Sequence, residues 1–323
     1  MVIGIDVGGT RLTAALARLD GSVEKRLRQP TEAGWVARDN LLALRDLTDE
    51  LLRAAKGRDA DVLSIGIGFG GPVDPVQGIV RRSHHVDGWE GVALRREFQQ
   101  AFRITTHVDN DANVAALGEL TYGAARNRRH VVYVNIGTGI GGALIVDGKL
   151  HHGAAGNAGE IGHTIIDRNG PVCTCGQCGC LEAFCAGPSI RRRAIARLCQ
   201  AAPESTSLPA GARAVRITPE AVFEAAQSGD VVAGELVRET ADLLGIGIAN
   251  VLNLVNPEQV IIGGGVAEAG DVLLEPLRRA IQSHAMPAAA AVEVVVAELG
   301  YDAGVLGAVA LAVEHAGDPG ADA

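Results

Sequence analysis

The sequence predicts an α/β fold built from two related domains, each offering a glycine turn to a shared cleft. At 323 residues the chain is too long for one ordinary core and suits two domains. Residues 2–21 and 131–148 both read as strand, glycine turn, strand, and both end in Asp-Gly. Apolar residues at helical spacing between the expected strands complete the α/β pattern.

The expected elements follow from hydrophobic pattern and turn residues. Buried strands are expected at 2–7, 11–19, 62–69, 104–108, 131–148 (a hairpin) and 259–266. Helices are expected at 38–56, after Asn110, from Thr218-Pro219-Glu220, at 231–254 and at 303–315, with a loop at 203–217. Laid over each other, the two glycine-interrupted hairpins place Asn135 where Asp6 stands, which indicates an internal duplication; chance likeness of two hairpins is the alternative.

Composition and charge exclude several classes of protein. Apolar residues make up 47% of the chain and charged residues 21%, as in a well-packed cytosolic enzyme. The net charge of −9 argues against binding to nucleic acid or to an anionic membrane. With no apolar signal segment at the start and no apolar run of membrane-spanning length, we expect a cytoplasmic protein.

Three glycine turns are candidate phosphate sites, because backbone N–H groups without side chains in the way can approach an anion. They comprise Gly8, Gly9 and Thr10 in the first turn, Gly137, Thr138 and Gly139 in the second, and Gly263, Gly264 and Gly265 in the third. Asp6 beside a phosphate would repel it unless a cation intervened, which suggests Mg²⁺ held directly or through water. A single turn of this kind is more often structural; three of them favour binding of ATP. No Walker A loop is present, and no GxGxxG opens a helix in a βαβ unit, which disfavours a nicotinamide-binding domain.

The segment VDNDAN (108–113) ends a strand and opens a helix. Asp109 and Asn110 read as helix caps. Asp111, at the carboxyl end of a strand, is placed to accept a proton from a sugar hydroxyl, and Asn110 can hydrogen-bond neighbouring hydroxyls.

A cysteine cluster in the second half predicts a metal site. A closed set of four ligands that suits structural zinc is formed by His163, Cys173, Cys175 and Cys180. Cys178 leaves open an alternative set of four cysteines, and free cytosolic thiols without a metal are a further alternative. Two carboxylates, Glu160 and Glu182, flank the cluster; carboxylates accept paired hydrogen bonds from vicinal diols.

These motifs together resemble the ROK family (repressors, open reading frames, kinases) of the actin-like ATPase superfamily, over nearly the whole chain. The resemblance is carried by DVGGT (6–10), GFGGPVD (68–74), NDAN (110–113), NIGTGIGG (135–142), GEIGH (159–163), CTCGQCGCLE (173–182) and NPEQVIIGGG (256–265). It implies an α/β, two-domain actin-like ATPase (ribonuclease H-like) fold with an interdomain cleft. The implied N-terminal domain covers 1–112 and is joined by the C-terminal helix 303–318; the C-terminal domain, 113–302, carries the zinc site.

The resemblance also implies roles for individual residues. Asp111 is then the catalytic base, and the sugar is contacted by Asn110, Glu160, His163 and Glu182, with Gly71 lining the pocket. His163 would serve both metal and sugar. One departure concerns His85, which stands where glucokinases of the family usually have Asn; a histidine can also hydrogen-bond a sugar hydroxyl, yet the choice of hexose is put in doubt.

The expected activity is an ATP-dependent hexose kinase using Mg²⁺, with glucose as the first substrate and 6-phosphorylation as the outcome. Alternatives are kinases of N-acetylmannosamine, N-acetylglucosamine, fructose or allose, polyphosphate as donor, or a non-catalytic sugar-sensing regulator. Repressors of the family carry a helix-turn-helix region before the first glycine turn, and here the first strand begins at residue 2, which favours the enzyme. A homodimer or homotetramer is expected.

Overall fold

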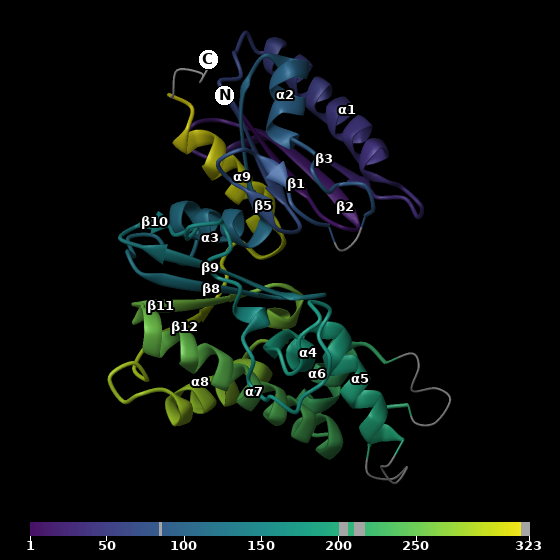
Figure 1. Ribbon diagram of the computed structural model, residues 1–323, viewed down its shortest axis with the longest axis vertical. Helices are drawn as coiled ribbons and strands as arrows, with labels where there is room; N and C mark the ends of the chain where they lie inside the picture. The colour runs from purple at the N-terminus through teal and green to yellow at the C-terminus, as the bar shows by residue number, and fades with distance from the viewer. Residues whose placement is uncertain (84–85, 200–205, 210–216, 318–323) are drawn as a thin grey trace. The chain divides into compact units, whose positions relative to one another are not determined.

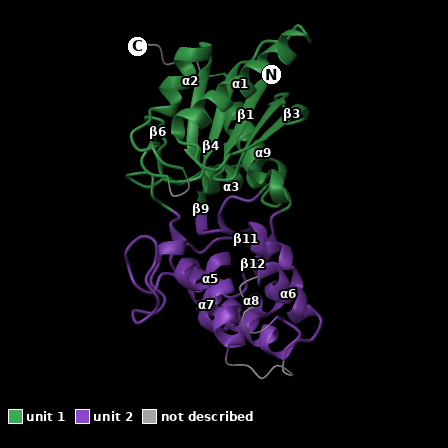
Figure 2. Ribbon diagram, turned by 90° about the vertical axis from the view of Figure 1, so that its right-hand side faces the viewer, with its two compact units in different colours: residues 1–127, 144–158, 298–323 green, residues 128–143, 159–297 purple. Residues whose placement is uncertain are grey.

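The computed structural model describes residues 1–83, 86–199, 206–209 and 217–317. The chain divides into two compact units (Figure 2). Unit 1 comprises Met1–Asn127, Leu144–Ala158 and the C-terminal segment from Glu298; unit 2 comprises Arg128–Ala143 and Gly159–Ala297. The chain forms two five-stranded sheets with helices packed beside them, as expected for an α/β fold (Figure 1).

The sheet of unit 1 has the strand order β3-β2-β1-β4-β7. These strands are β1 (Val2–Val7), β2 (Arg11–Ala17), β3 (Val23–Pro30), β4 (Ser64–Phe69) and β7 (Thr105–Asn110), with a separate small pair, β5 (Val73–Asp74) and β6 (Ile79–Val80). Strands β1, β4 and β7 run parallel, with Asp6 opposite Gly68 and Gly68 opposite Asp109. Because parallel strands end at the same edge, the segments after Val7, Phe69 and Asn110 meet there.

Strand alternation decides which helices cover each face of this sheet. Ile3, Ile5 and Val7 of β1 join the core that contains α1 (Ala37–Lys56) and α2 (Leu94–Phe102), whereas Val2 joins the core of α9 (Ala303–Glu314). Figure 1 shows α1 and α2 beside the sheet of unit 1 and α9 (yellow) on its other side. Helix α3 (Asp111–Tyr122) packs on α9.

Glycines permit this close packing of α9. A methyl group added at Gly66 of β4 would lie 2.1 Å from the carbonyl oxygen of Ala308, and one added at Gly307 would lie 1.8 Å from the carbonyl oxygen of Val114 in α3. The helix backbone therefore lies almost directly on the sheet and on α3. This contact fixes α3, whose first residue is Asp111.

The second sheet has the order β10-β9-β8-β11-β12. Its strands are β8 (Val131–Ile136), β9 (Ile140–Val146), β10 (Lys149–Leu150), β11 (Gln259–Gly263) and β12 (Glu293–Val296). The succession of hairpin, parallel strand and parallel strand seen in β2-β1-β4-β7 recurs in β9-β8-β11-β12. This shared topology supports the interpretation of an internal duplication.

The helices of unit 2 pack around its longest helix. They are α4 (Leu181–Cys185), α5 (Gly187–Leu198), α6 (Pro219–Gln227), α7 (Val231–Val255) and α8 (Asp271–His284), with short 3₁₀ helices η1 (Ile161–His163) and η4 (Gly265–Ala269); η5 (Gly300–Asp302) precedes α9 in unit 1. Helix α7 contacts α4, α5, α6 and α8. Thr218 caps α6 by accepting a hydrogen bond from the Ala221 N–H at 3.3 Å, as its sequence predicts.

One expected strand is shorter in the structure. The strand expected at 259–266 ends at Gly263, because Gly264 adopts a left-handed conformation (φ 82°) and η4 follows at once. The expected loop at 203–217 lies mostly outside the described residues. Among the helices described, none is long and apolar enough to cross a membrane.

Candidate functional site

In unit 1 the predicted base lies at the shared carboxyl edge of the parallel strands. Asp111 is the first residue of α3, directly after β7. A methyl group built at Gly70, after β4, would lie 3.8 Å from Asp111 Oδ2 and 4.0 Å from the Cα of Gly8. The end of β4, the first glycine turn and the predicted base therefore lie together.

Asn110, one of the predicted sugar-binding residues, makes a hydrogen bond through each end of its side-chain amide. Its side-chain oxygen accepts a hydrogen bond from the Ala112 N–H at 2.9 Å, so it is the N-cap of α3. Its Nδ2 donates to the carbonyl oxygen of Gly71 at 3.1 Å. The structure thus brings Gly71, Asn110 and Asp111 into one cluster. The remaining unit 1 candidate, His85, lies outside the described residues.

Asp109 is not a helix cap, contrary to its sequence reading. It is buried, and its Oδ1 accepts hydrogen bonds from the Asn110 N–H at 2.7 Å and from Asn113 Nδ2 at 2.8 Å. Its Oδ2 accepts a hydrogen bond from His152 Nε2 at 2.6 Å. Sequence analysis missed His152 entirely, since a histidine in a polar loop carries no local signal of a partner more than forty residues away.

Asp6 has the surroundings of a cation ligand. Its carboxylate lies against the first turn of α9, where a methyl group at Gly304 would come within 2.8–3.0 Å of it. Among the residues that the structure describes, none donates a hydrogen bond to Asp6. Burial raises the pKa of Asp6 to about 6, while Arg11 acts in the opposite direction. A half-buried carboxylate without a donor fits Mg²⁺ or a water bound to it.

In unit 2 the second and third glycine turns meet. Gly263 stands opposite Asn135 in the parallel pair of β11 and β8. A side chain at Gly264 would come within 2.4 Å of the carbonyl oxygen of Ile136 and 2.7 Å of Asn135 Oδ1, so only glycine fits there. Gly265 is exposed, with open space where a side chain would stand. The two turns therefore lie side by side, with Gly265 open to a ligand.

Glu182 ties the second glycine turn to the cysteine segment. Its Oε2 accepts a hydrogen bond from the Ile140 N–H at 2.9 Å, and its Oε1 accepts one from Thr174 Oγ1 at 3.0 Å. A methyl group at Gly139 would stand 2.7 Å from Oε2. Thr138, in the same turn, is exposed, and Gly137 accepts a backbone hydrogen bond from Gly187 at 2.8 Å.

The predicted metal ligands gather in one cluster. His163, Cys173, Cys175 and Cys180 offer ligand atoms that all lie within 4.8 Å of one another. Cys173 Sγ is 3.7 Å from His163 Nδ1, and Cys175 Sγ is 3.6 Å from Cys180 Sγ. Tetrahedral zinc with Zn–S of about 2.3 Å requires ligand separations of about 3.5–3.8 Å. The cluster can hold a metal ion of that kind, and Cys178 is outside it.

The other side of the His163 ring faces a carboxylate. His163 Nε2 lies 4.0 Å from Glu160 Oε2, while Nδ1 faces the cysteines. Burial raises the pKa of Glu160, with His163 opposing and Glu182 adding to the shift. If Nδ1 binds a metal, Nε2 keeps its proton and can donate to Glu160 or to a hydroxyl. The orientation of one imidazole thus links the metal cluster to a predicted sugar contact.

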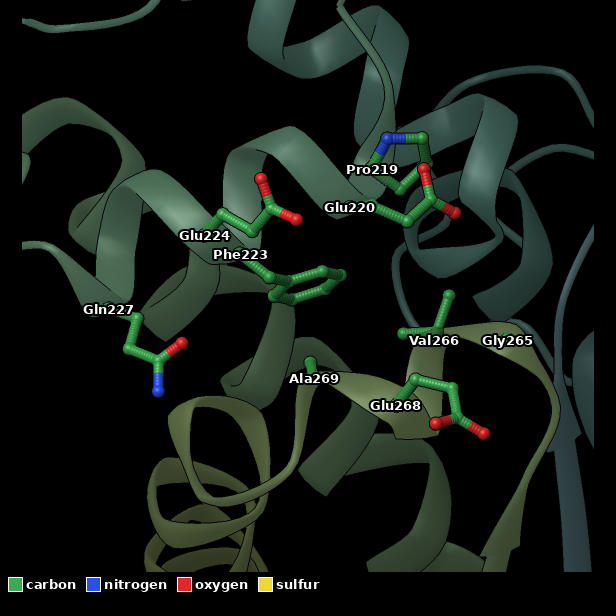
Figure 3. A pocket seen from close by; sticks show the side chains of 9 residues that line it. All are labelled: Pro219, Glu220, Phe223, Glu224, Gln227, Gly265, Val266, Glu268 and Ala269. Carbon is green, nitrogen blue, oxygen red and sulfur yellow. The ribbon is translucent and has the colours of Figure 1, made fainter. Parts of the chain in front are cut away.

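A pocket of about 180 Å³ adjoins the third glycine turn in unit 2 (Figure 3). It lies between α6 and η4 and is lined by Pro219, Glu220, Phe223, Glu224, Gln227, Gly265, Val266, Glu268 and Ala269. Figure 3 shows the Phe223 ring reaching from α6 toward Val266 and Ala269, with Glu220 and Glu268 at the side near Gly265. An apolar floor with an acidic rim suits the base and ribose of a nucleotide better than its phosphates. Only Gly265 among these residues was a sequence candidate.

Comparison with known proteins shows one family whose model matches nearly the whole chain. A family model described as "ROK family" matches residues 2–315. A glucokinase from Halalkalibacterium halodurans is 35% identical over 94% of this chain and 92% of its own length. A ROK family glucokinase from Streptomyces griseus, solved in complex with glucose and AMPPNP, has 31% identity and a TM-score of 0.79, covering 97% of this chain and 99% of that one.

A transcriptional regulator has a higher TM-score than this glucokinase. The ROK family regulator described as a homolog of the E. coli MLC protein has a TM-score of 0.87 and 29% identity. The match covers 98% of this chain and 78% of that one. Fold likeness alone therefore does not separate a kinase from a regulator.

Proposed function

The chain belongs to the ROK family, and from that premise we propose that it is an ATP-dependent sugar kinase, with glucose as its first candidate substrate. The observation that carries the proposal is the cluster at the carboxyl edge of the unit 1 sheet. There Asp111 lies beside a glycine turn, and Asn110 is held by both Ala112 and Gly71. A regulator that only senses sugar would not need a carboxylate base.

In the proposed reaction, Asp111 accepts the proton of the C6 hydroxyl of the sugar. The hydroxyl oxygen bonds to the γ-phosphorus of ATP, the bond from that phosphorus to the β–γ bridging oxygen breaks, and ADP leaves. Because the transition state is loose, the base chiefly orients the hydroxyl and takes the proton late. Asn110, Glu160, His163 and Glu182 are proposed to hold the other sugar hydroxyls, and Gly71 to line that site.

The nucleotide is assigned to two sets of residues. The pocket beside Gly265 is proposed to take the adenosine, with Phe223 packing on the base. Gly8, Gly9 and Thr10 in unit 1, and Gly137, Thr138 and Gly139 with Gly263 and Gly264 in unit 2, are proposed to donate N–H and hydroxyl groups to phosphate oxygens. Mg²⁺ would be held through Asp6 and would neutralise charge on the phosphates.

The metal cluster is proposed to bind structural zinc through His163, Cys173, Cys175 and Cys180. A closed four-ligand set leaves no open position for substrate, so zinc would stabilise the loop that carries His163 and Glu182 rather than act on the sugar. The expected homodimer or homotetramer, the absence of nucleic acid and membrane partners, and the cytoplasmic location stay predictions.

A coupled ADP-release assay with Mg-ATP across hexoses and N-acetylhexosamines tests this function. Turnover of glucose far above the other sugars would support a glucokinase; preference for N-acetylmannosamine, N-acetylglucosamine, fructose or allose would support a kinase of that sugar. Replacing ATP by polyphosphate tests the donor. No turnover in folded, metal-loaded protein would refute the proposal.

The second candidate is a sugar-sensing regulator, favoured by the TM-score of 0.87 to the regulator. It predicts sugar binding without ADP release. Isothermal titration of glucose, run beside the kinase assay, separates the two functions.

A further inference from the structure

We propose that His152 is a positioning residue that, through Asp109, holds the segment carrying the catalytic base. The inference rests on the proposed function, because it concerns what places Asn110 and Asp111. Asp109 is buried and precedes this pair directly, at the end of β7. His152 lies in the segment Leu144–Ala158, which belongs to unit 1.

Asp109 connects three parts of unit 1 through its two carboxylate oxygens. Oδ1 accepts hydrogen bonds from the Asn110 N–H at 2.7 Å and from Asn113 Nδ2 at 2.8 Å, so it fixes the backbone before Asp111 and the first turn of α3. Oδ2 accepts the His152 hydrogen bond at 2.6 Å. The side chain of Asp109 is 4% exposed. His152 is its only charged partner among the described residues.

A buried carboxylate needs a positive partner to stay ionised at low cost. His152 is suited to this, since its hydrogen bond to Asp109 raises its pKa above the ordinary value of 6.5, against the effect of partial burial. The charged groups that act on His152 are Asp109 from β7 and, more weakly, Glu314 at the end of α9. Protonated His152 therefore donates a charge-assisted hydrogen bond to Asp109, whose two oxygens accept three hydrogen bonds in all.

The loop around His152 is itself fixed to unit 1. The backbone carbonyl oxygen of His152 accepts a hydrogen bond from the Ala158 N–H at 3.0 Å. Gly156 packs so closely on Pro75 that a methyl group there would stand 2.9 Å from the proline ring. The chain leaves unit 1 directly after Ala158, and Glu160 follows two residues later. One ion pair thus anchors both the segment of the base and the start of the connection toward a proposed sugar contact.

The neighbouring histidine provides a matched control. His151 is exposed, and the backbone hydrogen bond from its N–H to the carbonyl oxygen of Leu144 does not depend on its side chain. H151F should therefore show the same sugar kinetics and the same backbone hydrogen-exchange rates as the wild type. H152F removes both the hydrogen bond and the charge from Asp109, whereas H152Q keeps an N–H donor without the charge.

The first test is kinetic. H152F should lower kcat/KM for the sugar about tenfold or more through misplacement of Asn110 and Asp111, with the KM for ATP unchanged. H152Q should recover only part of that loss at pH 7, because it restores the hydrogen bond to Asp109 but not the charge. In the wild type, kcat/KM for the sugar should fall as pH rises through the His152 pKa above 6.5, because protonation supports the anchor only below that pKa; H152Q should lack this step.

The second test does not depend on turnover. Hydrogen exchange at residues 109–113 and 150–158 should accelerate in H152F and much less in H152Q, and NMR should give His152 a pKa above 6.5. If H152F matches H151F in exchange and in sugar kinetics, or the NMR pKa is at or below 6.5, the inference is overturned. If neither the wild type nor any variant phosphorylates a sugar, the proposed function fails. Hydrogen exchange and NMR still decide whether the His152–Asp109 pair holds the segment in place.

Discussion

Glu119 offers the sharpest test of how the helix that carries Asp111 is held. It lies near the end of α3, is fully buried, and accepts three backbone hydrogen bonds. Oε2 accepts from the N–H groups of Ala124 at 2.8 Å and Glu298 at 3.1 Å, and Oε1 accepts from Leu299 at 2.8 Å. One carboxylate therefore joins α3 to the segment that returns to unit 1 before α9.

The size of the effect follows from those contacts. In E119Q the amide nitrogen must replace one of the two oxygens, so at least one buried N–H faces another donor. A lost hydrogen bond to a charged group and an unsatisfied buried donor together cost about 2–4 kcal/mol in the free energy of unfolding. In E119L all three N–H groups lose their acceptor, and the cost rises to about 3–6 kcal/mol. That is a large fraction of the total free energy of unfolding of a domain.

The assay combines guanidinium unfolding with hydrogen exchange, since exchange assigns the loss to unit 1. E119Q should shift the unfolding midpoint down and expose at least one of the amides of Ala124, Glu298 and Leu299 to exchange. The control is E32Q, because Glu32 is exposed and its side chain has no partner among the described residues. An E119Q midpoint equal to that of E32Q, with those amides still protected, would refute the reasoning.

Three further predictions concern unit 2. Cys175→Ser should lose the bound metal in an elemental analysis while Cys178→Ser keeps it, because only Cys175 belongs to the four-ligand cluster; equal metal content in both would contradict the assignment. Gly139→Ala should lower kcat/KM about tenfold without unfolding the protein, since its methyl group would displace Glu182 from the Ile140 N–H, and unchanged kinetics would reject that role. Phe223→Ala should weaken AMPPNP binding about tenfold in calorimetry and leave glucose binding intact, whereas an unchanged nucleotide affinity would exclude the pocket.

The parts of the fold that follow from local pattern were predictable from the sequence. Alternating apolar residues at 2–7 and helical spacing at 38–56 correspond to β1 and α1 within a residue. The spacing of the cysteines with His163 predicted the cluster that the structure assembles. In each case the determining interactions are near in sequence or repeat at a fixed period.

Other features depend on contacts between distant segments, which carry no local signal. Asp109 reads as a cap, but Asn110 takes that role and Asp109 binds His152. Glu182 reads as a sugar contact only, yet both of its oxygens accept protein hydrogen bonds. The residues around Phe223 became a candidate site only when the fold placed α6 against η4.

The central claim is that Asp111 is the base of a sugar kinase, and D111N tests it most directly. The substitution keeps size and polarity at the start of α3 but removes the group that accepts the proton. With the sugar that the wild type turns over best, kcat of D111N should fall by a factor of about 10²–10⁴, while calorimetric sugar affinity stays within a few-fold. A D111N enzyme that keeps kcat within a factor of about three while binding sugar normally would contradict the account.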